Sequence, residues 1–148
     1  MFPDRIEREI SIDAPVDRVW SVITEAEHVG RWFGDAGAQI ELRPGGRFSC
    51  TWAQHGTVLG VVERVEPPRF FSYRWARPVG EEVRAGNSTL VEFSLTPDGD
   101  RTRLKVVESG FRDLEGSNEA RAKYVEENTG GWKSELADLA EYAAKAAV

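Results

Sequence analysis

Glu108 is the residue whose type and position in this sequence most suggest chemistry. It shares the alternating parity of Leu104 and Val106, which predicts a side chain that points inward near the end of a strand. A carboxylate in an apolar interior is costly unless it is paired, so such a group is a candidate for proton transfer or for orienting a ligand. The alternative is a Glu108 that lies at the rim of the interior or in water.

Aromatic side chains form the second candidate group, because most of them fall on the inward parity of predicted strands or on the apolar stripe of a helix. Rigid rings often line a cavity, and an apolar pocket with a few polar groups is the usual small-molecule site. The same pattern is also that of an ordinary core. The candidate ligand-binding residues are Trp32, Phe33, Phe48, Trp52, Phe71, Tyr73, Trp75, Phe93, Glu108, Trp132 and Leu136. Tyr73 and Glu108 are the expected polar contacts.

Other catalytic and metal-binding patterns are missing from the sequence. His28 and His55 have no Cys or His neighbours at metal-ligand spacing, and we expect both to be solvated loop residues. Cys50 lies among inward aromatic residues with no obvious base, which predicts a buried structural thiol. The sequence has no G-x-S-x-G, P-loop or dinucleotide-binding glycine pattern. We therefore predict no catalytic residue, no metal and no cofactor, and regard an enzyme as the less favoured class.

Composition restricts the class of protein and of partner. The 148 residues include 19 Lys and Arg against 25 Asp and Glu, a net charge of −6, which disfavours nucleic acid and anionic membranes as partners. The length fits one domain over residues 1–148. The N-terminal residues show no signal peptide, and no apolar run is long enough to span a bilayer. We expect a cytoplasmic protein without membrane insertion.

Hydrophobic periodicity predicts the elements that would position these residues. A strand over 6–12 is followed by Asp13 and Pro15, where we expect the carboxylate to cap a short helix over 16–23, and Thr24–Glu25 to cap a second ending near Phe33. Residues 38–111 alternate with period two and contain Pro and Gly turn signals, which indicates an antiparallel meander with one buried face.

A long amphipathic helix is predicted from about Asn118 to Ala147. Its apolar stripe needs a cover, and the aromatic face of the sheet is the only surface large enough. Gly130 and Gly131 interrupt this helix, so we expect a kink or a close backbone contact there. The fold class is therefore α+β.

Seven short motifs, in order along nearly the whole chain, resemble a known family. They are residues 10–20 (ISIDAPVDRVW), 31–33 (RWF), 44–48 (PGGRF), 65–69 (VEPPR), 102–104 (TRL), 109–111 (SGF) and 131–132 (GW). The sequence is similar to the SRPBCC superfamily with its START-type helix-grip fold, within the branch named after the activator of the heat-shock-protein-90 ATPase. The resemblance implies a curved seven-stranded antiparallel sheet that grips the C-terminal helix, with two short helices between strands one and two.

The resemblance also implies what the protein does. Members commonly have a deep hydrophobic cavity, so we expect binding of a small lipid-like or polyketide-like molecule by a monomer or homodimer. Stimulation of a chaperone ATPase in the stress response, or a cyclase or hydrolase activity in the same cavity, are the alternatives. In this fold the first strand neighbours the last, so Arg8 and Glu108 could form an inward polar pair.

Overall fold

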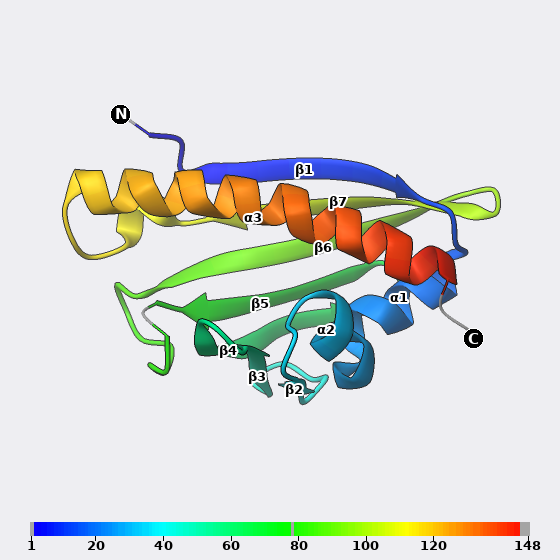
Figure 1. Cartoon of the computed structure of the whole chain (residues 1–148), viewed down its shortest axis with the longest axis horizontal. Coiled ribbons are helices and arrows are strands. Elements are labelled where there is room, and N and C mark those ends of the chain that lie inside the picture. The colour runs from blue at the N-terminus through cyan, green and yellow to red at the C-terminus, as the bar shows by residue number, and fades with distance from the viewer. Residues whose placement is uncertain (1, 78, 146–148) are drawn as a thin grey trace.

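The computed structural model describes residues 2–77 and 79–145 and contains one antiparallel sheet, two short helices, a 3-10 turn and one long helix (Figure 1). The elements in chain order are β1 (Arg5–Ile12), α1 (Val16–Thr24), α2 (Ala26–Trp32), β2 (Ala38–Ile40), β3 (Arg47–Trp52), β4 (Gly56–Glu66), β5 (Phe70–Ala76), β6 (Ser88–Asp98), β7 (Arg101–Ser109), the turn η1 (Phe111–Asp113) and α3 (Asn118–Lys145). The order of strands in the sheet is β1-β7-β6-β5-β4-β3-β2.

This arrangement is the helix-grip fold that the sequence predicts. The β1–β7 pairing joins strands that are distant in sequence, while β2 to β7 follow one another as a meander. The helix α3 lies along one face of the sheet, and α1 and α2 lie beside the C-terminal part of α3 (Figure 1). The structure describes α3 as far as Lys145, so the predicted end near Ala147 lies outside the described residues.

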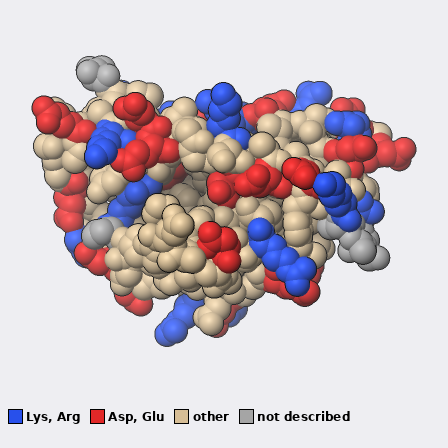
Figure 2. Space-filling model, in the orientation of Figure 1, with Lys and Arg blue, Asp and Glu red and all other residues tan. Residues whose placement is uncertain are grey.

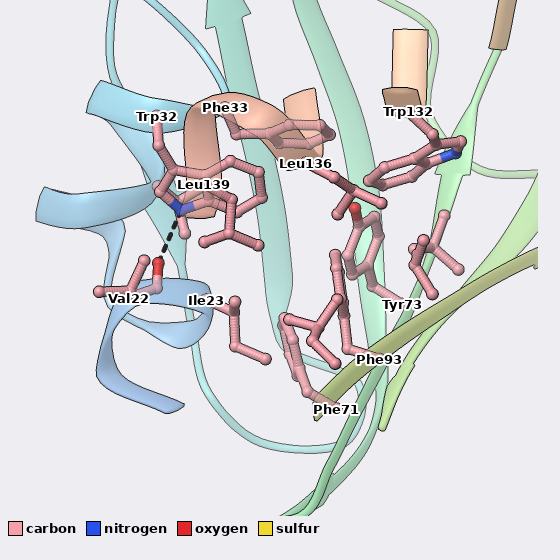
Figure 3. Close-up of a cluster of buried hydrophobic side chains, with 14 of the residues drawn as sticks. Val22, Ile23, Trp32, Phe33, Phe71, Tyr73, Phe93, Trp132, Leu136 and Leu139 are labelled. Carbon is pink, nitrogen blue, oxygen red and sulfur yellow. Dashed lines mark hydrogen bonds between the residues drawn. The ribbon is translucent and has the colours of Figure 1, made fainter. Parts of the chain in front are cut away.

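Side chains alternate between the two faces of β6 and β7, so that one face of each strand points into the core. Val91, Phe93 and Leu95 are buried on β6, and Leu104 and Val106 are buried on β7. The helix α3 covers this face with the predicted stripe, of which Val125, Trp132, Leu136, Leu139 and Ala143 are buried. Side chains of both layers meet in one core, in which Tyr73, Phe93, Trp132 and Leu136 point toward one another (Figure 3). Burial of this face is the main driving force for the fold.

The expected side-chain caps of the two short helices are not formed. Pro15 is the N-cap of α1, in an extended conformation, and it provides no side-chain hydrogen bond. Asp13 lies too far upstream to reach the first turn, and its carboxylate is 3.4 Å from Arg101 instead. Thr24 belongs to α1 and donates its hydroxyl to the Trp20 carbonyl, and the N-cap of α2, Glu25, makes no side-chain cap either.

Of the two alternatives expected at the glycines of α3, a kink or a close backbone contact, the close contact is not formed. The helix continues through Gly130 and Gly131, and a Cβ built on either residue meets no atom of the described residues within 4 Å. Gly34 is the position where close approach does matter. A Cβ there would lie 2.6 Å from both the Cys50 sulfur and the Thr51 carbonyl oxygen. The missing side chain thus lets the segment after α2 pack directly on β3.

Candidate functional site

A pocket of about 420 Å³ opens between the middle of α3 and the β3–β5 part of the sheet. The space-filling view shows the surface hollowed beneath α3, with carboxylates along the helix beside the hollow (Figure 2). Aromatic rings form much of its wall and polar side chains form its edge. The lining residues are Phe33, Trp52, His55, Val58, Trp75, Ala76, Arg77, Val79, Glu127, Asn128, Gly131, Trp132 and Glu135.

Four aromatic residues that the sequence singles out come together in this wall. Phe33, which follows α2, stacks on Trp75 of β5 and on Trp132 of α3, with ring centroids 5.5 Å apart in both cases. Trp52 of β3 meets the edge of Phe33 at 5.1 Å. Such offset and edge-on pairs add to the stability of ring burial, and they place three indole groups around one space. The pocket can therefore accept a flat apolar group.

Glu108 is fully buried directly behind this wall. Its Oε2 accepts hydrogen bonds from Trp75 Nε1 at 2.9 Å and from Thr89 Oγ1 at 2.6 Å. Its Oε1 accepts from Trp132 Nε1 and from Asn128 Nδ2, both at 2.9 Å. Side chains from β5, β6 and α3 thus converge on one carboxylate of β7. An ionised carboxylate only accepts hydrogen bonds, so it suits a position faced by donors alone.

The inward direction of Glu108 is confirmed, but the proposed pair with Arg8 is not formed. Arg8 lies opposite Val106 in the β1–β7 register, and its side chain is exposed. Ile6 is the residue opposite Glu108. Neutral indole, hydroxyl and amide groups donate to Glu108, instead of the Arg8 guanidinium that we expected.

Asn128 is a part of this network that sequence reasoning missed. It lies one helical turn before Trp132, on the same face of α3. Besides donating to Glu108, its Oδ1 accepts from Arg77 Nη2, and Arg77 packs its guanidinium over the Tyr124 ring, 4.6 Å from the ring centroid. A polar residue beside the apolar stripe was the available signal. Its partners depend on where the helix crosses the sheet.

The remaining candidates do not line this pocket. Five of them lie in the closed core, where Figure 3 labels Phe71, Tyr73, Phe93 and Leu136. The fifth, Phe48, is also buried and stacks on Tyr73 with ring centroids 3.9 Å apart. The Tyr73 hydroxyl is buried and has no hydrogen-bond partner among the described residues. Burial raises the pKa of this hydroxyl well above its ordinary value.

Trp32 belongs to a second, more open pocket of about 590 Å³ between α2 and the end of α3. Its indole N–H donates to the Val22 carbonyl at 2.8 Å (Figure 3). His28 lies in the same pocket, on α2 and not in a loop, with Nδ1 2.7 Å from the Tyr142 hydroxyl. Its side chain is 21% exposed, so the expectation of a solvated loop histidine is wrong. Within residues 2–77 and 79–145, no three His, Cys, Asp or Glu residues are grouped to hold a metal ion.

Glu135 is the second functional candidate that the sequence did not single out. It is half-buried and lines the pocket one turn of α3 beyond Trp132. Burial raises the pKa of its carboxyl to about 8, and the nearby Asp138 and Asp35 carboxylates add to the shift. A carboxyl group that is largely protonated at neutral pH can donate or accept a hydrogen bond.

Cys50 should be inert toward thiol reagents in the folded protein. Burial raises the pKa of its thiol to about 12, and the Glu135 carboxylate adds to the shift. Since the thiolate is the reactive form, alkylation by iodoacetamide at pH 8 should be at least about 100-fold slower than in the unfolded chain. Mass spectrometry with and without denaturant measures both rates. Equal rates would show that the thiol is accessible and ionised, contrary to its burial.

Comparisons with known proteins agree with the fold. Residues 13–144 match the family model described as "Activator of Hsp90 ATPase homolog 1-like protein". None of the curated proteins matches the sequence. Among the described residues, no helix has the length and apolar character needed to cross a membrane.

Three solved structures illustrate the likeness. CalU16 from Micromonospora echinospora is 28% identical, with a TM-score of 0.69, and the alignment covers 95% of this chain and 76% of that chain. DynU16, a protein in the dynemicin biosynthetic locus, is 25% identical, with a TM-score of 0.72 and 97% of this chain covered. This chain spans 48% of the length of DynU16. The Aha1 dimer from Colwellia psychrerythraea is 14% identical, with a TM-score of 0.76, covers 96% of this chain and 98% of that chain, and shows the shared fold.

Proposed function

The chain belongs to the family of Activator of Hsp90 ATPase homolog 1-like proteins, and from that premise we propose that it binds a small hydrophobic, ring-containing molecule between the sheet and α3. The observation that carries the proposal is the pocket of about 420 Å³ walled by Phe33, Trp52, Trp75 and Trp132. Small-molecule sites in proteins typically have volumes of about 300–1,000 Å³ and apolar walls with few polar groups.

Glu108 contributes to this function by positioning the wall. Its carboxylate holds the indole N–H groups of Trp75 and Trp132, whose rings face the pocket. Because both oxygens of Glu108 already accept hydrogen bonds, the group has no free lone pair directed at a ligand. This arrangement supports binding over the cyclase or hydrolase alternative, in which Glu108 was the expected acid or base.

The genetic context of one similar protein supports the choice of ligand class. DynU16 lies in the dynemicin biosynthetic locus, which links a protein of this fold to the biosynthesis of a small molecule. A ligand of about 20 non-hydrogen atoms that gains about 0.3 kcal/mol per atom would bind with a dissociation constant in the tens of micromolar.

Tryptophan fluorescence tests the proposal directly. Trp52, Trp75 and Trp132 line the pocket, whereas Trp20 and Trp32 do not. A hydrophobic ligand from sterol, fatty-acid and polyphenol panels should quench the fluorescence, and native mass spectrometry should detect the complex or a copurified molecule. The Trp52→Phe variant should lose part of the quenching, and the matched Trp20→Phe variant should keep it. Absence of quenching and of any bound species across the panels would refute the proposal.

A second candidate is stimulation of an Hsp90-type ATPase, which the description of the family supports. This function would use the surface of the domain instead of the pocket. ATPase stimulation that a pocket-blocking substitution leaves unchanged would favour it.

The oligomeric state is a separate expectation. The dimer of the Colwellia protein supports a homodimer as one of the two expected oligomeric states.

A further inference from the structure

Glu135 presents an unused hydrogen-bonding atom at the pocket. Its side chain lines the pocket, and its Oε2 atom is buried without a hydrogen-bond partner in residues 2–77 and 79–145. Buried carboxylate oxygens in native proteins are nearly always paired, so an orphan one needs an explanation. Because Glu135 also lines the pocket, a ligand there can supply the missing partner once the carboxylate turns toward the open space.

The charged groups around Glu135 favour a cation over an anion at this place. Asp138 on α3 and Asp35 after α2 are the charged residues that act most strongly on its carboxyl group. Cys50 of β3 and Tyr73 of β5, which face it from the sheet, carry no charge because burial raises the pKa of both.

The other polar lining groups lie around the same pocket. Glu127 is the second carboxylate of the pocket lining, and His55 lines the pocket from the turn between β3 and β4. Arg77 is a cationic lining residue, and it is engaged by Asn128 and Tyr124. Asn128 precedes Glu135 by seven residues of α3, or about 10 Å along the helix. The Glu135 end of the pocket therefore lies away from the Arg77–Asn128 contact, with Asp35 and Asp138 as its nearby carboxylates.

Aromatic rings and a carboxylate together form a site suited to organic cations. An ammonium group is attracted to the faces of indole rings, and a carboxylate beside those rings supplies its counter-charge. Here Trp52, Trp75 and Trp132 supply the rings and Glu135 the carboxylate. Neutral hydrophobic ligands would use the rings but leave Oε2 of Glu135 unpaired.

We propose that the ligand of this pocket carries a basic nitrogen attached to an aromatic or alicyclic body, and that Glu135 is the counter-ion of that nitrogen. This inference rests on the proposed function of the pocket and specifies the class of molecule that fills it. The ring system lies against the indole groups, and the ammonium group pairs with the Glu135 carboxylate, which turns toward it.

Proton linkage gives the proposal a distinctive signature. Glu135, with a pKa of about 8, is mostly protonated at pH 7 and must lose its proton to pair with an ammonium group. Affinity for the cation should therefore rise by about tenfold per pH unit from pH 6 toward pH 8 and then level off. A neutral ligand should bind equally well across this range.

Isothermal titration calorimetry with three naphthalene probes tests the inference. The probes are 2-(aminomethyl)naphthalene, 2-naphthalenemethanol and 2-naphthoate, which share a ring system and differ in charge. At pH 7.5 the amine should bind at least about tenfold more tightly than the alcohol, and the carboxylate most weakly. The Glu135→Gln variant should bind the amine and the alcohol alike, with no dependence on pH. The Glu127→Gln variant removes a carboxylate from the same pocket and should retain the preference.

The outcomes distinguish a failure of this inference from a failure of the proposed ligand-binding function on which it rests. Equal binding of the amine and the alcohol by the unmodified protein would overturn the role of Glu135 while leaving the hydrophobic pocket in place. Tighter binding of 2-naphthoate would overturn it as well, because a protonated Glu135 would then be donating to an anion. Binding of none of the three probes would refute both the pocket's proposed function and the inference that rests on it.

Discussion

Replacing Glu108 with glutamine should lower the free energy of unfolding by about 2–3 kcal/mol, the largest stability effect that we expect from an isosteric substitution in this protein. The indole N–H groups of Trp75 and Trp132 approach different oxygens of Glu108, and an indole nitrogen can only donate. Whichever way the new amide turns, its NH₂ group faces one of the two indoles. An NH₂ group that faces Trp132 leaves that indole without an acceptor. One that faces Trp75 leaves that indole only Thr89 Oγ1, at 3.0 Å, and deprives the Thr89 hydroxyl of its carboxylate acceptor. Chemical denaturation measures the loss.

Removal of a buried negative charge acts in the opposite direction. Burying a carboxylate without a cation is costly, so glutamine recovers part of the desolvation penalty. We expect the lost charge-assisted hydrogen bonds to outweigh that gain, because five of them converge on Glu108 from four side chains. Glu92→Gln, at a half-buried carboxylate on the opposite face of β6, is the matched control and should shift stability by less than about 0.5 kcal/mol. An unchanged or higher stability of Glu108→Gln would show that charge burial dominates.

The same substitution should weaken ligand binding, because displacement of either indole changes the wall of the pocket. Ligand affinity that Glu108→Gln leaves unaltered would show that the network stabilises the fold without shaping the site.

Replacing Gly131 with leucine should weaken ligand binding strongly while stabilising the helix. Gly131 lines the pocket, and apart from its chain neighbours and the backbone of its own helix no atom of the described residues lies within 4 Å of the position that its Cβ would occupy. A leucine side chain would extend into the space that we assign to the ligand, so affinity should fall by at least about tenfold, or about 1.4 kcal/mol. Leucine also favours a helix interior over glycine by roughly 0.8 kcal/mol, which should raise the unfolding temperature. Fluorescence titration and thermal denaturation measure the two effects.

Gly130 is the matched control for this experiment. It is the preceding residue of α3, equally free of described neighbours within 4 Å, and it does not line the pocket. Gly130→Leu should therefore raise the unfolding temperature to a similar extent and leave affinity unchanged. Equal affinity of the two variants would show that the ligand does not occupy the space beside Gly131.

Periodicity determined which side of each element is buried. Alternation along β7 placed Glu108 inward with Leu104 and Val106, and the stripe of α3 placed Trp132 and Leu136 against the sheet. These predictions succeeded because burial of one face is a local property, with a period that the chain itself carries. The motifs added the identity of the fold, which the family match confirms.

Only the tertiary structure decided which buried groups meet and which of them border open space. Parity alone did not distinguish Phe48 and Phe93, which are sealed in the core, from Trp52 and Trp75, which wall the pocket. It also did not show that Glu108 takes its donors from neighbouring strands and α3, with Arg8 left in solvent. The depth of a side chain and the identity of its hydrogen-bond partners depend on where α3 crosses the curved sheet. That crossing is set by packing among segments far apart in sequence. The hydrophobic periodicity of a single element contains no information about this crossing.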